Sequence, residues 1–393
     1  MITRVGFTLI GGKNWTGGYN YLVNLLQVLA TEQALALVPV LFVGTDISDT
    51  ELAPFAAIAG CELIRDAAFD DSARSASLVR SLVLGRDAAV HAALERERVD
   101  VAFESAFFLG WRLKCAAIAW IPDLQHRFLA QHFTRAAWWR REIGFRAQIA
   151  SGRTVMCSSE DTRQACERIY PRTRGRVHAV RFALRAPESL PDEMARAVAV
   201  RHGLPERFFF MPNQFWEHKN HNLVVQALKL LRERGQAPTV VACGAQRDPR
   251  NPGHVSALLS EVRAAGLEEY FLAPGLLPYA DLMPLMQAST ALLNPSLFEG
   301  WSTTVEEARA AGVPMLLSDL PVHREQAGEL ATYFDRNSAA SLADAMTAFK
   351  PLTPAQRMAR RAQARGEAAV RVAGFAADFV QLVQRAAAGR QRQ

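Results

Sequence analysis

The stretch 291–308 reads ALLNPSLFEGWSTTVEEA. Its apolar start ends at Asn294-Pro295-Ser296, and Glu299, Gly300 and a short Ser/Thr segment precede a predicted helix that carries Glu307. This order predicts a strand, a loop and a helix, as in a parallel α/β sheet. Free amides at a helix N-terminus favour an anion, and the two carboxylates can accept hydrogen bonds from hydroxyl groups. The stretch therefore suits a ligand with phosphate in its middle and polyols at both ends, such as a nucleotide sugar.

The same residues also fit a purely structural role. Thr304 with Glu307, or Thr303 with Glu306, has the spacing of a capping box. Such a cap stabilises a helix by about 1 kcal/mol without any ligand. The stretch alone leaves both interpretations open, and the rest of the chain has to decide between them.

Both halves of the chain alternate predicted strands with predicted helices. In the first half we expect strands at 4–10, 37–43, 101–104, 116–121 and 154–157, and a helix at 19–31 with leucines at helical spacing. In the second half we expect strands at 207–211, 239–242, 270–272, 291–293 and 315–317, and a helix at 223–232. A polar stretch with two prolines, 185–192, lies between the halves. The pattern predicts two doubly wound α/β domains with parallel sheets.

On these residues the chain resembles the family 4 retaining glycosyltransferases, and within them the bacterial enzymes that build surface polysaccharide. That family carries two glutamates in the pattern E-G-x-x-x-x-x-x-E-A, and here 299–326 reads EGWSTTVEEARAAGVPMLLSDLPVHREQ. The resemblance implies the GT-B fold, with two Rossmann-like domains and a cleft between them. It implies an acceptor-side domain at 1–185, a nucleotide-sugar-binding domain at 186–366, and a C-terminal helix at 367–393 that crosses back to the first domain.

The resemblance also implies roles for this stretch. Glu299 would bind the hydroxyls of the donor sugar, and Glu307 would bind the ribose. Sugar and diphosphate would meet the backbone amides of Gly300, Trp301, Ser302, Thr303 and Thr304.

The loop 212–221, PNQFWEHKNH, is the expected source of positive charge for the phosphates. A diphosphate leaving group needs a cation, and lysine supplies a point charge. The family has a lysine here, so the resemblance assigns phosphate contact and a catalytic role to Lys219; a solvated loop lysine is the alternative. Many members also have an arginine where this chain has Asn213 and Gln214, whose amides can bond phosphate without supplying its charge.

Two glycine-containing loops are further candidates for donor binding. Gly17 and Gly18 come directly before the first predicted helix, and glycine lets backbone amides approach a phosphate closely. They are better placed for this than Gly11 and Gly12. The loop of Gly275, Leu276 and Leu277 resembles the family loop that packs beside the nucleotide base, and an ordinary turn explains it equally well.

The segment 120–126, WIPDLQH, follows a predicted strand whose end faces the expected cleft. Many family members have His-Asp here, and the histidine contacts the donor sugar. Pro122 replaces that histidine, so its role cannot be transferred. Asp123 remains as a candidate catalytic residue, and His126 could approach from the following turn.

Residues 126–146 interleave five arginines with five aromatic side chains, and Glu142 is their only acidic residue. A basic, aromatic helix of this kind can lie on an anionic membrane. It can equally be a core stripe with a solvated basic face. We carry forward peripheral contact with the inner membrane, or with an anionic or lipid-linked acceptor, as a hypothesis.

Composition limits the other possibilities. The longest apolar stretch, 34–43, is too short to span a membrane and is interrupted by Pro39. Residues 1–10 are expected to form a strand rather than a signal peptide. The five cysteines are scattered without ligand spacing, which argues against disulfides and structural zinc. These features favour a cytoplasmic protein, peripheral on the inner face of the cell membrane if the hypothesis on 126–146 holds.

The sequence therefore predicts a hexosyltransferase that needs neither metal nor cofactor. The resemblance favours GDP-mannose or a similar donor. It favours glycan or lipid-linked acceptors in the synthesis of surface polysaccharide or lipopolysaccharide. Alternatives are a sugar-nucleotide epimerase or phosphorylase on the same fold, and a glycosidase that uses the two glutamates as acid and base. A dinucleotide-dependent oxidoreductase is disfavoured because no G-x-G-x-x-G follows the first strand. A non-catalytic nucleotide- or nucleic-acid-binding protein is favoured only by the net charge of +6.

Overall fold

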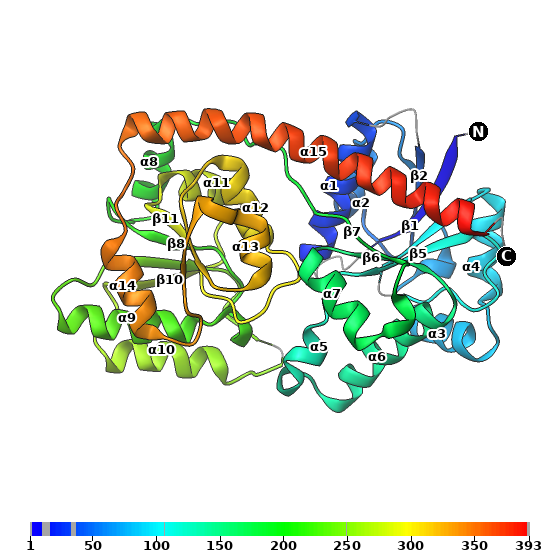
Figure 1. Cartoon of the computed structure of the whole chain (residues 1–393), viewed down its shortest axis with the longest axis horizontal. Coiled ribbons are helices and arrows are strands. Elements are labelled where there is room, and N and C mark those ends of the chain that lie inside the picture. The colour runs from blue at the N-terminus through cyan, green and yellow to red at the C-terminus, as the bar shows by residue number, and fades with distance from the viewer. Residues whose placement is uncertain (1, 10–15, 33–36, 106, 249, 391–393) are drawn as a thin grey trace. The chain divides into compact units, whose positions relative to one another are not determined.

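The computed structural model describes residues 2–9, 16–32, 37–105, 107–248 and 250–390. The chain forms two compact units, each built around a parallel sheet (Figure 1). The first unit comprises 1–124, 135–182 and 371–393, and the second comprises 125–134 and 183–370. The sequence predicted boundaries after 185 and 366. It placed the short segment 125–134 in the first domain, whereas its contacts assign it to the second unit.

The first unit has a seven-stranded sheet in the order β3-β2-β1-β4-β5-β6-β7, and every pairing is parallel. Its strands are β1 (Thr3–Thr8), β2 (Leu37–Val43), β3 (Glu62–Arg65), β4 (Val101–Ser105), β5 (Ala116–Ile121), β6 (Thr154–Cys157) and β7 (Val177–Ala179). Its α-helices are α1 (Thr16–Glu32), α2 (Asp49–Ala56), α3 (Arg74–Val83), α4 (Ala88–Arg96), α6 (Arg135–Ala150) and α7 (Glu160–Ile169).

The second unit has a six-stranded parallel sheet in the order β10-β9-β8-β11-β12-β13. Its strands are β8 (Phe209–Met211), β9 (Val240–Cys243), β10 (Phe271–Gly275), β11 (Ala291–Asn294), β12 (Met315–Ser318) and β13 (Ala331–Phe334). Its α-helices are α5 (Gln125–Phe128), α8 (Asp192–Arg201), α9 (His221–Glu233), α10 (His254–Ala264), α11 (Tyr279–Ala288), α12 (Thr303–Ala311), α13 (Pro321–Ala327) and α14 (Ala339–Ala348).

Helix α15 (Pro354–Arg390) is a single helix of 37 residues. Its residues 354–370 belong to the second unit, and 371–390 belong to the first. In the first unit Phe379 stacks on Phe7 of β1 at a ring-centroid distance of 6.0 Å, and Phe375 packs against Phe182 at 5.8 Å. The C-terminal part of α15 is therefore a component of the first core.

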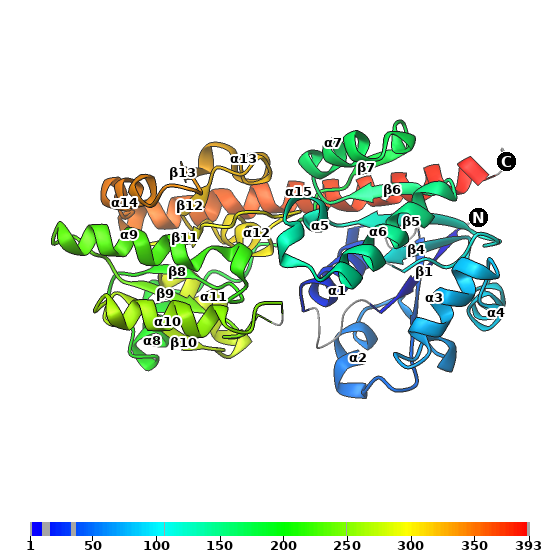
Figure 2. The same ribbon diagram turned by 90° about the horizontal axis from the view of Figure 1, so that it is seen from below.

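The alternation of side chains along the strands divides the core of the second unit into two layers. Phe209 and Met211 pack in one hydrophobic cluster together with α9, α10 and α14. Phe210, which lies between them in β8, packs in the other cluster with α8, α11 and α12. Because successive strand residues point to opposite faces, a strand buried on both faces is apolar throughout. Figure 1 shows α9 and α10 on one side of this sheet and α11 and α12 on the other, and Figure 2 views the unit from the side of α9 and α10.

Most predicted elements are present, with small shifts at their ends. The predictions for β2, β5 and β6 match the observed bounds, and α9 begins two residues earlier than expected. The sequence prediction missed β3, β7 and β13, which are short strands at the sheet edges. The C-terminal helix begins at Pro354 rather than at 367. Gly366 lies just before the predicted start and is inside the observed helix. An isolated glycine within a helix lowers its stability only modestly.

Candidate functional site

The second unit brings Lys219 and Glu299 together at the carboxyl ends of its strands. Lys219 ends the short 3-10 turn that follows β8, and Glu299 lies in the loop after β11. The Lys219 Nζ atom is 2.6 Å from the Glu299 Oε1 atom, and the two side chains are 14% and 9% exposed. Ligands bind at this end of open parallel sheets. The cation and the carboxylate predicted to serve one donor thus share one location.

A network of short polar side chains fixes the position of Glu299. The Ser296 Oγ atom lies 2.7 Å from Glu299 Oε1 and 2.7 Å from Asn294 Oδ1, so its hydroxyl can donate to either. The Asn294 Nδ2 group donates to the Ser302 Oγ atom at 3.0 Å. Asn294 and Ser296 are fully buried. The residues Asn294-Pro295-Ser296 predicted only the end of a strand, and their sequence did not indicate this role.

Helix α12 begins at Thr303, with Ser302 at the N-cap position. The structural interpretation of the sequence was a capping box with Thr303 or Thr304 as cap, and this is wrong because both residues are inside the helix. The Ser302 side chain makes no capping hydrogen bond to the amides of the first turn. The Ser302 hydroxyl instead meets Asn294 and the Thr304 Oγ1 atom, 3.2 Å away. The helix N-terminus therefore keeps amide donors for a ligand.

Gln326 of α13 holds this turn from the other side. Its Oε1 atom accepts from the Ser302 amide at 3.3 Å, and its Nε2 group donates to the Ser302 carbonyl at 2.7 Å. The same group reaches Glu306 Oε2 at 3.3 Å. Glu306 and Gln326 are fully buried, so of the two adjacent glutamates in α12 Glu306 is structural.

Glu307 is the other glutamate and points elsewhere. It is half-buried, and no hydrogen bond or ion pair joins its carboxylate to any described residue. Desolvation raises its pKa to about 7. Desolvation also raises the pKa of the exposed Tyr279 phenol, and the charge of Glu307 raises it further. Glu307 thus has acceptor oxygens available for hydroxyl groups, as the ribose assignment requires.

The loop after β8 carries the two predicted amide residues in different situations. Asn213 is 4% exposed, and its Nδ2 group has no hydrogen-bond partner among the described residues. A buried donor without a partner is costly unless a ligand or water completes it. Gln214 accepts from the Ala245 amide at 3.0 Å, which ties it to the loop after β9. Asn213 is therefore the better candidate for phosphate.

Gly244 explains how these two loops come so close. Its φ is +153°, and a Cβ atom there would lie 2.4 Å from the Asn213 carbonyl oxygen. Its amide donates to the Gly275 carbonyl at 2.9 Å. Gly275 ends β10, Leu276 is 72% exposed, and Leu277 packs against the core. Leu276 is thus the residue of this loop that offers the larger apolar surface to a base.

His323 is a buried residue that the sequence analysis did not assign. Its Nδ1 atom lies 3.1 Å from Ser318 Oγ, and that hydroxyl donates to the Ser296 carbonyl at 2.7 Å. Burial lowers the His323 pKa to about 4, which the nearby Glu299 charge partly opposes. The neutral imidazole therefore supports the loop that carries Glu299. In the sequence, His323 belongs to the segment HREQ at 323–326, which is part of the family pattern. That pattern did not indicate a role for the histidine itself.

In the first unit, Gly17 and Gly18 lie in the first turn of α1 and not before it, because α1 begins at Thr16. Their amides belong to the helix N-terminus, where donors are free. Gly11 and Gly12 lie outside the described residues.

Asp123 follows β5, and its Oδ1 atom accepts from the Arg141 guanidinium at 2.7 Å. His126 is buried in the second unit beside Phe133, with ring centroids 6.4 Å apart.

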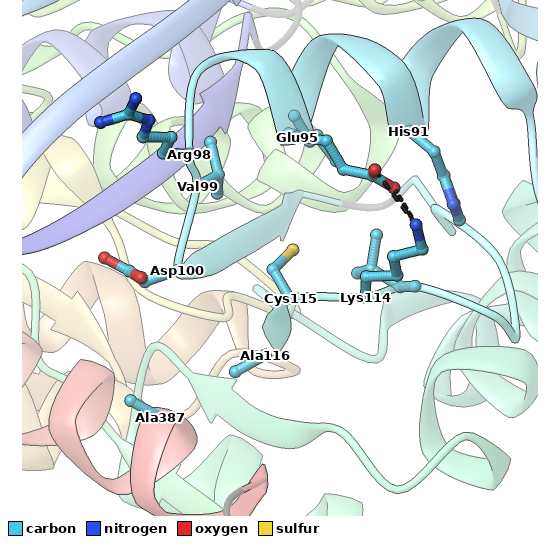
Figure 3. A pocket seen from close by; sticks show the side chains of 11 residues that line it. His91, Glu95, Arg98, Val99, Asp100, Lys114, Cys115, Ala116 and Ala387 are labelled. Carbon is cyan, nitrogen blue, oxygen red and sulfur yellow. Dashed lines mark hydrogen bonds and ion pairs between the residues drawn. The ribbon is translucent and has the colours of Figure 1, made fainter.

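A cavity of about 530 Å³ opens in the first unit beside α4 (Figure 3). It is lined by Asp100 and Cys115, at the amino ends of β4 and β5, and by Glu95 and Lys114, which form an ion pair at 3.0 Å. It is thus at the opposite end of the strands from Asp123. It is separate from the candidate site.

In the part of the chain that the structure describes, no three His, Cys, Asp or Glu side chains form a group that could hold a metal ion. Within the same residues, none of the helices has an apolar stretch that could cross a bilayer.

Residues 198–366 match the family model of glycosyl transferases group 1. No curated protein matches the chain in sequence.

Many solved structures resemble the whole chain at low sequence identity. A glycosyltransferase from Rickettsia africae has a TM-score of 0.72 at 12% identity, with 98% of each chain covered. HepE from Anabaena, in complex with UDP and glucose, has a TM-score of 0.69 at 13% identity, covering 96% of this chain and 98% of HepE. WaaG, a glycosyltransferase involved in lipopolysaccharide biosynthesis, has a TM-score of 0.62 at 17% identity, with 98% of each chain covered. The chain therefore has the two-domain GT-B fold, and within it residues 198–366 are similar to the family of glycosyl transferases group 1.

Proposed function

We propose that the protein is a retaining hexosyltransferase that moves a sugar from a nucleoside-diphosphate sugar to a glycan or lipid-linked acceptor. The observation that carries this proposal is the position of Lys219 and Glu299, 2.6 Å apart beside the uncapped start of α12. One cation, one carboxylate and a set of free amides are what a sugar diphosphate needs.

In the proposed binding mode the parts of the donor meet different residues. Glu299 accepts hydrogen bonds from the sugar hydroxyls, and Glu307 accepts those of the ribose. Lys219, Asn213 and the amides of Gly300 to Thr304 face the diphosphate. Lys219 is paired with Glu299, so a bound phosphate would compete with that carboxylate for the lysine. Gly17 and Gly18 are proposed as a second source of amides.

The reaction proposed here uses no protein nucleophile. The acceptor hydroxyl attacks the anomeric carbon from the side of the leaving group, the bond from that carbon to phosphate breaks, and the departing phosphate takes the hydroxyl proton. The protein's contribution is to position both substrates and to stabilise the negative charge that develops on the diphosphate. Asp123 is proposed to act near the reacting centre. Because this scheme needs neither metal nor cofactor, EDTA should leave activity intact.

The biological setting is proposed as bacterial surface polysaccharide, including lipopolysaccharide, at the cytoplasmic face of the membrane. The likeness to WaaG and the basic, aromatic stretch 126–146 support this setting. GDP-mannose is the proposed donor. The UDP and glucose bound to HepE make a UDP-sugar the natural comparison.

Calorimetric titration of UDP, GDP and ADP into the wild type and Glu307→Ala tests the proposal. We expect one nucleotide to bind selectively and the Glu307→Ala variant to lose most of that affinity. Product analysis with the matching nucleotide sugar then separates transfer from epimerisation. If no nucleotide binds, with or without an oligosaccharide acceptor present, the proposed function is wrong.

A further inference from the structure

Arg250, in the loop that follows β9, contacts the turn Glu217–Lys219 that ends at the candidate site. Its Nη2 group donates to the His218 Nδ1 atom at 3.1 Å. Its guanidinium also lies over the Trp216 ring, 5.2 Å from the ring centroid, and Trp216 is the residue before the turn. One side chain from a different loop therefore contacts both the start and the middle of this turn.

Asp248 joins the backbone of the same turn to Arg250. Asp248 is 2% exposed, and its Oδ2 atom accepts from the Glu217 amide at 3.0 Å while its Oδ1 atom accepts from the Arg250 amide at 2.9 Å. Burial by itself would raise the pKa of Asp248, but these two amides and the Arg250 charge outweigh burial and lower it. An ionised carboxylate thus bonds the backbone of the turn and of Arg250 together.

The contact with Arg250 also determines which nitrogen of His218 carries the proton. A guanidinium has only donors, so the His218 Nδ1 atom accepts and the ring proton is on Nε2. His218 is 4% exposed. Burial, followed by the charges of Lys219 and Arg250, keeps its pKa well below the ordinary range. His218 is therefore a neutral imidazole in a single tautomer, next to Lys219 in the chain.

The backbone of His218 joins this arrangement to the loop of Glu299. Its carbonyl accepts from the Leu297 amide at 2.8 Å, and the Lys219 amide closes the turn by donating to the Trp216 carbonyl at 2.8 Å. The ring of His218 is thus bonded to Arg250, and its backbone is bonded to the loop of Glu299. A displacement of His218 would change the position of Lys219 relative to Glu299.

The remaining contacts of Arg250 show that it is suited to hold neighbouring residues rather than a ligand. Its Nη1 group donates to the Gln125 Oε1 atom at 3.1 Å, and its Nε group donates to Asp248 at 3.4 Å. The guanidinium also lies 5.7 Å from the ring centroid of Phe133. Together with the bond to His218, all three side-chain nitrogen atoms of Arg250 have a partner within the second unit.

We propose that Arg250 is a positioning residue for Lys219. Through His218 and Asp248 it fixes the turn Glu217–Lys219 where the lysine ammonium group meets Glu299. The inference deepens the proposed function and rests on it, because that function gives Lys219 its contact with the donor diphosphate. Position matters there, since a displacement of about 1 Å can lower a reaction rate by about 100-fold.

A double-mutant cycle between Arg250 and Lys219 tests whether one residue acts through the other. Calorimetry measures the Kd of whichever of UDP, GDP and ADP binds to the wild type. Arg250→Met should weaken this binding by about 10-fold in the wild type but by less than about 2-fold in Lys219→Met. Arg247→Met is the matched control, because Arg247 is an exposed arginine of the same loop without a hydrogen bond or ion pair to another described residue. It should bind as the wild type does.

Urea unfolding of the same four proteins tests the positioning without any nucleotide. If Arg250 keeps Lys219 beside Glu299, Lys219→Met should shift the unfolding midpoint clearly less in the Arg250→Met background than in the wild type. Arg250→Lys keeps the charge but not the planar fork of donors, so its midpoint and its nucleotide affinity should lie between those of the wild type and Arg250→Met. It also replaces Arg250→Met in both cycles if circular dichroism shows that Arg250→Met is unfolded.

Nitrogen-15 NMR of the histidine side chains reads the contact itself. The wild type should show His218 with a bare Nδ1 atom and a protonated Nε2 atom, assigned by the signals that His218→Gln lacks, and Arg250→Met should show a mixture of the two neutral tautomers. Additive effects of Arg250→Met and Lys219→Met in both cycles, or an unchanged His218 tautomer in Arg250→Met, would overturn the proposal. Absence of nucleotide binding to the wild type would overturn the proposed function instead, and the urea cycle would still decide whether Arg250 positions Lys219.

Discussion

The Lys219 ammonium group and the Glu299 carboxylate form an ion pair of 2.6 Å between two loops that are eighty residues apart in sequence. The two side chains are mostly withdrawn from solvent, and Ser296 holds the same carboxylate oxygen. A sugar diphosphate that binds here has to exchange this internal pairing for its own contacts. We therefore expect substitutions in this pair to lower both the stability of the fold and the rate of sugar transfer.

We expect Lys219→Met to lower kcat/KM by about 10²–10³-fold, because one positive donor to the developing phosphate charge is lost. The variant also leaves Glu299 without its cation, and loss of one partner of a buried pair costs about 3 kcal/mol of unfolding free energy. Urea unfolding measures this. The Lys219→Met/Glu299→Gln double variant should recover part of the stability but none of the activity.

The Lys229–Glu261 pair provides the control for that experiment. It has the same residue types and the same 2.6 Å separation but is 39% and 35% exposed. Lys229→Met should change stability by less than about 1 kcal/mol, because exposed pairs contribute little. Equal losses of stability in Lys219→Met and Lys229→Met would contradict the prediction that burial makes the Lys219–Glu299 pair the more important of the two.

Ser296→Ala tests whether the orientation of Glu299 matters. The variant removes a hydroxyl 2.7 Å from that carboxylate. We expect kcat/KM to fall by about 10-fold to 100-fold, since a hydrogen bond to a charged group contributes about 1.5–3 kcal/mol. Steady-state kinetics with varied donor should show the loss, and Ser296→Thr should restore most of it. An unchanged KM and kcat in Ser296→Ala would mean that Lys219 alone positions Glu299.

Glu307 predicts a pH dependence with a definite sign. Desolvation raises its folded-state pKa from 4.5 to about 7, so the native state holds a proton that the unfolded state releases between these values. Its contribution therefore lowers stability as the pH rises through that window. Glu307→Gln should remove this slope and be more stable than the wild type at pH above 7. Urea unfolding across the window compares the two proteins.

Donor binding should respond in the opposite direction. The ribose hydroxyls need an ionised acceptor, so affinity for a nucleotide sugar should rise as the pH passes upward through about 7. Calorimetry in buffers of different ionisation enthalpy should detect proton release on binding below that pH. Glu307→Gln should bind weakly at every pH and release no proton. Wild-type binding without proton release would place the ribose elsewhere.

Gly312 allows close packing at the end of α12. Its φ is +68°, and a Cβ atom would lie 2.9 Å from the Arg360 carbonyl oxygen of α15. Gly203 has φ +67° and no atom within 4 Å of the same position. Gly203→Ala should cost about 1 kcal/mol from backbone strain alone, and Gly312→Ala about 1–3 kcal/mol more from overpacking. Thermal unfolding of both variants measures the difference, and equal losses would mean that α15 moves away without cost.

The sequence by itself determined the repeating strand-and-helix plan. Strand β5 was predicted with its observed bounds because its sequence is a short, continuous apolar run. Such a run is typical of a strand buried on both faces of a parallel sheet, and all six residues of β5 are buried. The segment from Asn294 to Glu307 was likewise recognisable, because a strand end, a glycine loop and a helix start must follow one another along the chain. The order of strands, loops and helices along the chain can be predicted because it depends on neighbouring residues.

Tertiary structure alone decided which polar side chains are already engaged. The sequence could not distinguish Glu306 from Glu307. Glu306 meets Gln326 in the interior, whereas the Glu307 carboxylate has no hydrogen bond or ion pair with the residues that the structure describes. The sequence also could not show that Ser296 and Lys219 meet Glu299, or that Ser302 is the N-cap residue of a helix that begins at Thr303 and lacks a capping box. Short edge strands such as β7 were missed for the same reason, since pairing with β6 stabilises them more than their own three residues do. The Lys219–Glu299 pair, the Gln326–Glu306 contact and the pairing of β7 with β6 join segments that are distant in the chain, and no local pattern records them.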